Sequence, residues 1–175
     1  MPASRLRQPR SLDDLLLYRL ARLLAVSGSM VIRLCEGRFG ITRREWRVIA
    51  RLAQERGQEL LSSELAASIQ LDRARTSRAI TSLVAKRLLR RQPGTADRRQ
   101  ARLALTEQGQ ALYEALFPLV CEINRDLLAV VPAADVQRLD RALAAMQQQA
   151  DRLVERAELP KADRRRGGRA RIGVV

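Results

Sequence analysis

The place where the hydrophobic period changes constrains this fold more than any other feature of the sequence. Through most of the 175 residues, apolar side chains recur every three or four positions, which is the spacing of amphipathic helices. In residues 101–105 the period becomes two, as expected of a half-buried strand. Residues 88–91 are a second strand candidate, and Pro93-Gly94 begins a turn between the two. The sequence therefore predicts a mostly α-helical fold with one small β-hairpin.

Polar residues ahead of the apolar stripes predict where the first helices begin. Ser11 with Asp14, and Thr42 with Glu45, have the spacing of capping boxes, in which side chains bond the unpaired amides of the first turn. The first pair predicts a helix over residues 11–36, and the second pair predicts a helix that follows it. The expected buried face of this second helix consists of Trp46, Ile49 and Leu52.

Three further helices are expected along the chain. A short one covers residues 63–69, and Asp72 caps the next, which runs to about Lys86. Thr106 caps a long helix that follows the hairpin. The apolar side expected for the helix that Asp72 opens consists of Ile80, Leu83 and Val84.

Two apolar stripes are longer than one small domain can cover. One runs along residues 11–36, and the other lies in residues 107–159, where the last helix repeats apolar residues three and four apart over almost three heptads. The residues of that seam are Val136, Leu139, Leu143, Met146, Ala150 and Leu153. A seam of this kind packs against another helix, so both ranges are expected to be dimerisation helices of a homodimer.

The positive charge is concentrated rather than spread. The chain has a formal net charge of +14, and residues 72–102 alone carry ten lysines and arginines against two aspartates. Residues 1–10 and 160–175 are also basic, and we expect them to be a disordered arm and a disordered tail. One sign of charge gathered in a central block is typical of a surface that binds phosphates.

Residue types that the chain lacks exclude several classes of function. It contains no histidine, and Cys35 and Cys121 lie too far apart for a Cys-x-x-Cys motif. We therefore expect no catalytic residue, no metal site and no cofactor. Three arginines interrupt the most apolar stretch, residues 15–35, so we expect a cytoplasmic protein with no membrane partner. Aromatic residues are scarce, which disfavours RNA binding through base stacking.

The order of elements in residues 42–106 is helix, short helix, turn, helix and basic hairpin, which is typical of a winged helix-turn-helix. On a helical wheel of the last of these helices, Arg75, Arg78 and Ser82 lie opposite Ile80. An arginine fork can pair with two acceptors of guanine, so these residues are expected to read base edges of double-stranded DNA.

Other residues of this block are candidates for DNA contact as well. Arg73 and Ser77 lie near the start of the same helix, where phosphate contacts are an equal alternative, and Thr76 lies at the edge of its apolar side. In the hairpin, or wing, the candidates are Arg91, Arg98 and Arg99.

These residues carry a resemblance to the MarR (multiple antibiotic resistance regulator) family, which extends over about residues 12–155. The matching motifs are Ser62–Ala66, Leu71–Arg78, Asp97-Arg98-Arg99, and Leu105-Thr106 followed by Gly109. The resemblance implies a homodimer in which two winged helices share a helical base. It also implies that the helix with Arg75 enters the major groove and that Arg99, or else Arg98, enters the minor groove. Asp97 is expected to structure the wing.

One residue departs from the family pattern. The family usually has glycine after the DNA-reading helix, where this chain has Arg87. A left-handed turn at an arginine would cost about 1 kcal/mol. Two alternatives follow: either the chain accepts this strain, or its turn differs.

The resemblance further implies a transcriptional repressor that leaves a palindromic operator when a small aromatic carboxylate binds. Candidate ligand contacts are Tyr18, Arg22, Arg43, Trp46 and Arg47, since arginine beside an aromatic ring suits an aromatic acid. Trp46 can equally be a core residue, and either cysteine is a candidate oxidant sensor. The alternative function is an architectural, nucleoid-type DNA-binding protein that responds to no ligand.

Overall fold

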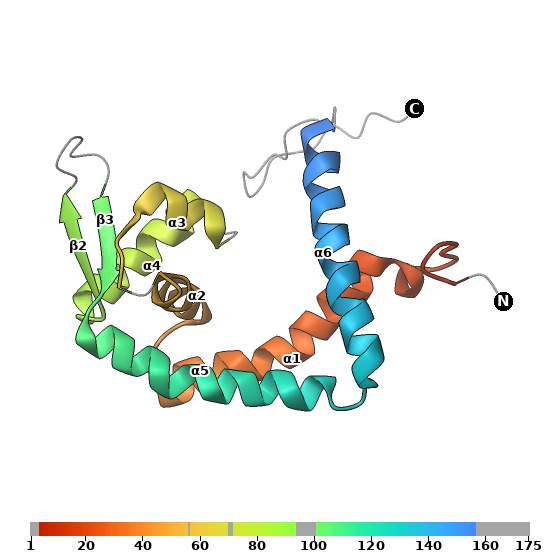
Figure 1. Cartoon of the computed structure of the whole chain (residues 1–175), viewed down its shortest axis with the longest axis horizontal. Coiled ribbons are helices and arrows are strands. Elements are labelled where there is room, and N and C mark those ends of the chain that lie inside the picture. Colours follow the sequence, from red (N-terminus) through yellow and green to blue (C-terminus); the bar gives the residue numbers. More distant parts are fainter. Residues whose placement is uncertain (1–3, 56, 70–71, 94–100, 157–175) are drawn as a thin grey trace, which may run out of the picture. The chain divides into compact units, whose positions relative to one another are not determined.

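The computed structural model describes residues 4–55, 57–69, 72–93 and 101–156 (Figure 1). The chain divides into two compact units, Met1–Ala129 and Val130–Val175. The basic tail expected at residues 160–175 lies outside the described residues. Residues 4–10, which were predicted to be disordered, contain a turn in which the amides of Arg7 and Gln8 donate to the Ser4 carbonyl oxygen.

The structure confirms a mostly helical fold with a small antiparallel sheet. In the first unit the elements are η1 (Leu12–Asp14), α1 (Leu16–Arg38), α2 (Arg43–Ala53), β1 (Leu60–Leu61), α3 (Ser62–Ser68), α4 (Arg73–Ala85), β2 (Leu89–Pro93), β3 (Ala101–Leu105) and α5 (Glu107–Leu128). The second unit contains α6 (Ala133–Arg156). Among the described helices, none is both long and apolar enough to cross a membrane.

The first helix begins later than its sequence suggests. Ser11 makes no capping bond, residues Leu12–Asp14 form a short 3-10 turn, and the extended backbone of Leu15 separates that turn from α1. The Asp14 carboxylate, which was expected to complete a capping box, instead accepts bonds from the Arg10 amide and the Ser11 hydroxyl. These bonds close the turn, so the helix starts at Leu16.

The other predicted caps are confirmed. The Glu45 amide donates to Thr42 Oγ1 at 3.2 Å, and the Thr42 amide donates to Glu45 Oε2 at 2.5 Å, which completes a capping box. The Asp72 carboxylate and the Thr106 hydroxyl likewise cap α4 and α5. Each cap joins residues three apart, so the local sequence alone specifies it.

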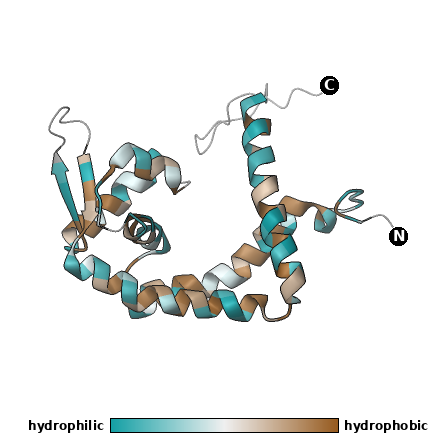
Figure 2. Cartoon of the chain, viewed as in Figure 1, coloured by the Kyte–Doolittle hydropathy of each residue, from teal (hydrophilic) through white to brown (hydrophobic). Residues whose placement is uncertain are grey.

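The core of the first unit surrounds α2, which packs against α1, α4 and α5. The predicted buried face of α2 is confirmed, since Trp46, Ile49 and Leu52 are all buried. In Figure 2, brown and teal segments alternate along α5, as expected of an amphipathic helix. On α4 the prediction is wrong at Val84, whose side chain is 37% exposed, while Thr76 and Ala79 are buried. The buried positions of α4 are Thr76, Ala79, Ile80 and Leu83, a narrow stripe that repeats every three or four residues and leaves Val84 beyond its edge.

The sheet has three strands in the order β1-β3-β2, and both pairings are antiparallel. Strand β1 was not predicted, because two residues are too few to show a period. In β3, Ala101 and Leu103 are buried as expected, but so is Ala104, and Leu105 is only partly buried. The cross-strand partner of Ala104 is Arg90, whose long aliphatic stem can cover a side chain as small as alanine.

The turn between α4 and β2 settles the question raised by Arg87. This residue has φ 58°, so the left-handed conformation is adopted and its strain is accepted. The Arg87 amide donates to the Val84 carbonyl oxygen, and the Leu88 amide donates to the Leu83 carbonyl oxygen, each at 3.0 Å. This pair of bonds is a Schellman motif, which ends the helix and sends the chain into the wing.

Candidate functional site

Helix α4 presents four polar residues to solvent. Arg75 and Arg78 are exposed on the side opposite the buried stripe, as the helical wheel indicates, and Arg73 and Ser77 are exposed nearer to that stripe. Thr76 is different: it is only 2% exposed, and its hydroxyl donates to the Asp72 carbonyl oxygen at 3.1 Å. Thr76 is therefore a core residue of α4, and the prediction that it contacts DNA is wrong.

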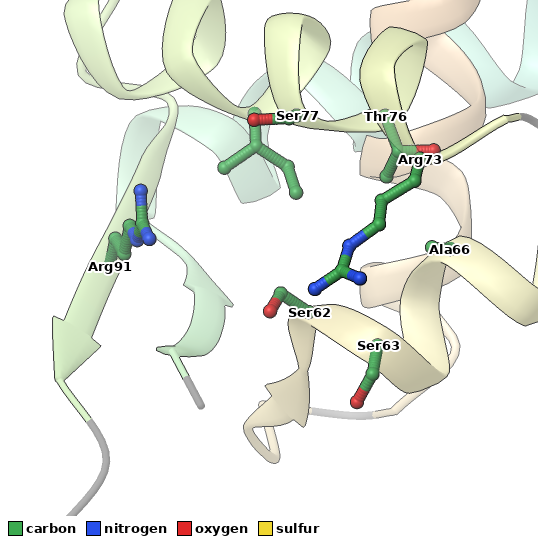
Figure 3. A pocket seen from close by; sticks show the side chains of 8 residues that line it. Ser62, Ser63, Ala66, Arg73, Thr76, Ser77 and Arg91 are labelled. Atoms are coloured by element: carbon green, nitrogen blue, oxygen red, sulfur yellow. The ribbon is translucent and has the colours of Figure 1, made fainter. Parts of the chain in front are cut away.

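A hollow of about 520 Å³ lies between α4, the start of α3 and strand β2. We call it the α3 hollow; its lining residues are Ser62, Ser63, Ala66, Arg73, Thr76, Ser77, Ile80 and Arg91. Figure 3 shows the Arg73 guanidinium extending from α4 toward Ser62 and Ser63, with Arg91 on the other side. Two guanidinium groups and several hydroxyls around one hollow suit a phosphate group.

A second, smaller hollow of about 180 Å³ lies where α4 meets the start of α2. We call it the α2 hollow; it is lined by Thr42, Arg44, Glu45, Arg75, Arg78, Ala79 and Ser82. Here Arg44 joins Arg75 and Arg78, although residue 44 is thirty-one positions from residue 75. Three arginines at one hollow again favour a polyanion.

The sequence analysis named Ser62 and Ser63 only as part of a family motif, and it did not predict Ser62, Ser63 or Arg44 as DNA contacts. The serines open a short helix and could have been suggested as phosphate contacts on that ground. Arg44 had no such signal, because an arginine on an amphipathic helix resembles any solvated charge until α2 packs beside α4.

A buried ion pair connects α2 with the end of α4. The Glu45 side chain is 2% exposed, and Lys86 Nζ lies 3.0 Å from its Oε1 atom and 2.9 Å from the Gly40 carbonyl oxygen. Burial by itself raises the pKa of Glu45, but hydrogen bonds from Ser82, Thr42 and Lys86 outweigh it and leave this pKa below its ordinary value. Ser82, predicted to contact DNA, is half-buried and bonded to this carboxylate.

Part of the predicted wing site lies within the described residues. Arg91 is exposed on β2 and lines the α3 hollow. Arg90 and Arg102 lie 3.8 Å and 4.0 Å from the Glu59 carboxylate, which stands at the same sheet. Asp97, Arg98 and Arg99 lie outside the described residues.

Three of the five predicted ligand contacts come together in one pocket. Arg43, Trp46 and Arg47 of α2 face α1 and α5 around a cavity of about 270 Å³. Its other lining residues are Leu24, Ser27, Gly28, Val31, Val120, Ile123, Asn124 and Leu127. We call it the α2–α5 pocket.

The charge of this pocket is unbalanced. No ion pair within 4.0 Å joins Arg43 or Arg47 to a carboxylate in the described part of the chain. Burial, and then the positive charge of Arg43, lower the pKa of Arg47. A Cβ atom at Gly28 would lie 3.3 Å from Arg43 Nη1, so glycine leaves room for this guanidinium. Two guanidinium groups beside a tryptophan ring suit an aromatic anion.

Tyr18 and Arg22 do not line this pocket, which corrects the prediction. Arg22 Nη1 lies 2.8 Å from Asp13 Oδ1, and the Arg22 guanidinium lies 5.9 Å from the centroid of the Tyr18 ring. Only the stretch of α1 from Leu24 to Val31 reaches the pocket. Because a helix rises about 1.5 Å per residue, Tyr18 lies roughly 15 Å along α1 from Gly28.

The two cysteines are free. Cys35 is fully buried, and burial raises the pKa of its thiol, which disfavours the reactive thiolate. Cys121 is half-buried on α5. Within the ranges that the structure describes, no group of three or more cysteines, aspartates and glutamates is placed to hold a metal ion.

Comparison with known proteins agrees with this geometry. Residues 39–100 match the sequence model of the MarR family. No curated protein sequence matches the chain. Among solved structures, AbsC, a MarR-family transcriptional regulator from Streptomyces coelicolor, is 21% identical with a TM-score of 0.69, and the match covers 77% of this chain and 91% of AbsC.

Two further structures are similar. BpsR of Bordetella bronchiseptica, whose DNA binding is regulated by 6-hydroxynicotinic acid, is 20% identical with a TM-score of 0.62, covering 74% of this chain and 98% of BpsR. MarR of E. coli in its apo form is 24% identical with a TM-score of 0.56, covering 73% of this chain and 95% of MarR. Residues 39–100 thus match the MarR family, and the chain shares the winged-helix fold of these solved structures.

Proposed function

We propose that this protein is a sequence-specific DNA-binding transcriptional repressor. The observation that carries the proposal is that arginine-lined hollows stand on both sides of the exposed face of α4. A helix in the major groove has base edges in front of it and a phosphate backbone on each side. The α3 hollow, with Arg73 and Arg91, is suited to one backbone, and Arg44 at the α2 hollow is suited to the other. Arg75 and Arg78 line the α4 side of the α2 hollow and are expected to reach the bases.

The operator is expected to be a palindrome read by a homodimer. On α1 the apolar residues Leu17, Leu20, Leu23 and Leu24 are exposed in the single chain, and on α6 so are Leu139, Leu143, Met146 and Leu153. An exposed apolar stripe on a helix is a surface for another helix. A twofold dimer presents two α4 helices, so its half-sites are expected about one helical turn of DNA apart, or a small multiple of that.

The ligand is expected to be a small aromatic carboxylate bound in the α2–α5 pocket. Arg43 and Arg47 are suited to the carboxylate, and Trp46 is suited to the ring. A cavity of about 270 Å³ matches a one-ring acid better than a larger molecule. The similar protein BpsR responds to an acid of this size, 6-hydroxynicotinic acid.

Helix α2 connects the pocket with the DNA-reading helix. Its residues Arg43 and Arg47 line the pocket, and Glu45, between them in sequence, holds Lys86 at the end of α4. A ligand that displaces α2 would therefore displace α4 as well. To release DNA, the ligand has to bind this displaced conformation more tightly than the conformation that binds DNA.

Sequencing the fragments that the protein selects from genomic DNA, followed by binding measurements on the best site and on random DNA, tests the function. We expect Arg75→Ala and Arg78→Ala to cost about 1–3 kcal/mol on the selected site and much less on random DNA. Arg44→Ala and Arg73→Ala should weaken binding to the selected site and to random DNA about equally. Each should also reduce the slope of log affinity against log salt concentration by about one. Equal losses on both DNAs for all four variants would favour the architectural alternative.

A further inference from the structure

Both carboxylate oxygens of Asp72 contact the same residue, Arg75, one through a hydrogen bond and the other through an ion pair. Asp72 Oδ1 accepts the backbone amide of Arg75 at 2.8 Å, which is the N-cap bond of α4. Asp72 Oδ2 lies 3.0 Å from Arg75 Nε, the innermost nitrogen of the guanidinium group. One aspartate therefore holds the backbone and the side chain of the same arginine.

The ion pair between Asp72 Oδ2 and Arg75 Nε is not required for capping. Serine, threonine and asparagine cap helices as well as aspartate does, with one acceptor atom. The side chains are also partly exposed, at 54% for Arg75 and 32% for Asp72, and exposed ion pairs contribute little to stability. The Nε contact thus has a consequence other than stability: it restricts the conformations of the Arg75 side chain.

This restriction leaves the reading end of Arg75 available. A guanidinium group has five N–H donors, and the ion pair with Asp72 lies on the Nε side of the group, which carries one of them. The four donors on the two terminal nitrogens remain, and these form the fork that pairs with guanine O6 and N7. The neighbouring Arg78 is held differently, because its Nε donates to a backbone acceptor, the Ala74 carbonyl oxygen, at 3.4 Å rather than to a carboxylate.

The negative charge of Asp72 also favours base contacts of Arg75 over phosphate contacts. An arginine paired with a carboxylate is a weaker phosphate ligand, since the carboxylate repels the phosphate and offsets the positive charge. Contacts to base edges depend more on geometry, and a pre-positioned fork loses less entropy when it binds.

We propose that Asp72 is a specificity-determining residue that positions Arg75 for base reading and disfavours its binding to phosphates. This inference rests on the proposed function, because it needs an operator that the protein prefers. It predicts that loss of the Asp72 charge changes the two kinds of DNA binding unequally.

The test is Asp72→Asn in the full chain, measured on the selected site and on random DNA at fixed salt. Asparagine keeps the helix cap but carries no charge, so the ion pair with Arg75 Nε is lost. We expect affinity for the selected site to fall about tenfold, a loss within the range of one good arginine–guanine pair. Affinity for random DNA should stay the same or rise, because a negative charge near the DNA has been removed.

A matched control is available on α6. Asp135 Oδ1 lies 3.0 Å from Arg138 Nη1, which is the same kind of exposed pair three residues apart in the first turn of a helix. Asp135→Asn should leave the ratio of the two affinities unchanged. Asp72→Ser, which also keeps a capping oxygen, should behave like Asp72→Asn.

A double-mutant cycle separates positioning from folding. In an Arg75→Ala background, Asp72→Asn should no longer change the ratio of the affinities. Two results would overturn the positioning role. One is that Asp72→Asn lowers the affinities for the selected site and for random DNA equally, together with the melting temperature. The other is that Asp72→Asn lowers the ratio of these two affinities by the same factor whether residue 75 is arginine or alanine. A wild-type protein that prefers no sequence would overturn the proposed function itself, and this is seen before any variant is made.

Discussion

Thr106 Oγ1 donates a 2.7 Å hydrogen bond to the carbonyl oxygen of Arg87, nineteen residues earlier in the chain. The same hydroxyl accepts from the Gly109 amide, and the Thr106 amide donates to the Leu88 carbonyl oxygen. The first turn of α5 therefore holds the strained turn that leads from α4 into the wing. This explains why Leu105-Thr106 and Gly109 form a motif together with the winged helix.

Replacing Arg87 by glycine should stabilise the protein. Among the described non-glycine residues, Arg87 alone has a positive φ, and glycine adopts that conformation without steric cost. We expect Arg87→Gly to raise the free energy of unfolding by about 0.5–1 kcal/mol in a urea titration. Arg90→Gly, in strand β2, serves as the control and should lower it, since glycine weakens a strand interior.

Gly109 should not tolerate even alanine. A Cβ atom there would lie 2.0 Å from the Leu88 carbonyl oxygen, a backbone atom that could move only with the whole turn. Gly109→Ala is expected to lower the free energy of unfolding by about 1–3 kcal/mol. Gly37→Ala is the matched change, because a Cβ atom at Gly37 meets nothing within 4 Å inside α1. If both changes had the same effect on thermal unfolding, the close approach would be refuted.

The Glu45–Lys86 pair should make stability depend on pH below neutrality. Because the pKa of Glu45 is lowered in the folded state, its contribution is complete above the unfolded-state pKa, near 4.5. That contribution is lost as the pH falls through the folded-state pKa. Urea unfolding of Glu45→Gln between pH 7 and pH 3 should show a smaller decrease than that of the wild type.

Removing Lys86 should cost more than removing the whole pair. Lys86→Met leaves the buried Glu45 carboxylate without its cation, so we expect a loss of about 1–3 kcal/mol at pH 7. The double change Glu45→Gln with Lys86→Met should recover part of that loss. A double variant as unstable as the sum of the two single changes would contradict coupling between them.

Aromatic carboxylates should stabilise the protein and weaken its binding to the selected DNA site. A panel that includes 6-hydroxynicotinic acid can be screened by melting temperature and by DNA binding. Arg43→Ala should blunt the ligand response by at least about tenfold, which is the loss of one charged contact, while changing DNA binding less. Trp46→Ala should also blunt the response more than DNA binding, because the contact with the ligand ring is lost. Arg22→Ala, outside the α2–α5 pocket, should respond like the wild type. A panel without effect on either quantity would favour the ligand-independent alternative.

Deleting residues 134–175 should abolish the dimer and most binding to the selected site. The deletion removes nearly all of α6, whose apolar residues are exposed in the single chain. Sedimentation is expected to show monomers or aggregates, and a well-folded truncated dimer would refute the role assigned to α6. Removing only residues 161–175 should leave the dimer intact and weaken binding to all DNA, since these residues are basic.

Interactions between residues close in sequence could be predicted from the sequence alone. The caps at Thr42, Asp72 and Thr106, the buried face of α2 and the exposed arginines of α4 depend on contacts within a few residues, and helical spacing specifies such contacts. At Arg87, where glycine is usual, the sequence left two alternatives open, and the structure adopts the left-handed turn. Among the predicted caps, the one at Ser11 was wrong, because the Asp14 carboxylate accepts from the Arg10 amide and the Ser11 hydroxyl instead.

Contacts between distant residues were decided by the tertiary structure. Glu45 pairs with Lys86, forty-one residues later in the chain, and Arg44 lies with Arg75 and Arg78 at the α2 hollow. The two-residue strand β1 is formed only by its pairing with β3. Tyr18 and Arg22 share α1 with Gly28 but lie too far along it to reach the α2–α5 pocket. The physical reason is that hydrophobic periodicity shows which face of a helix is buried, whereas the packing of whole helices determines which residues face it.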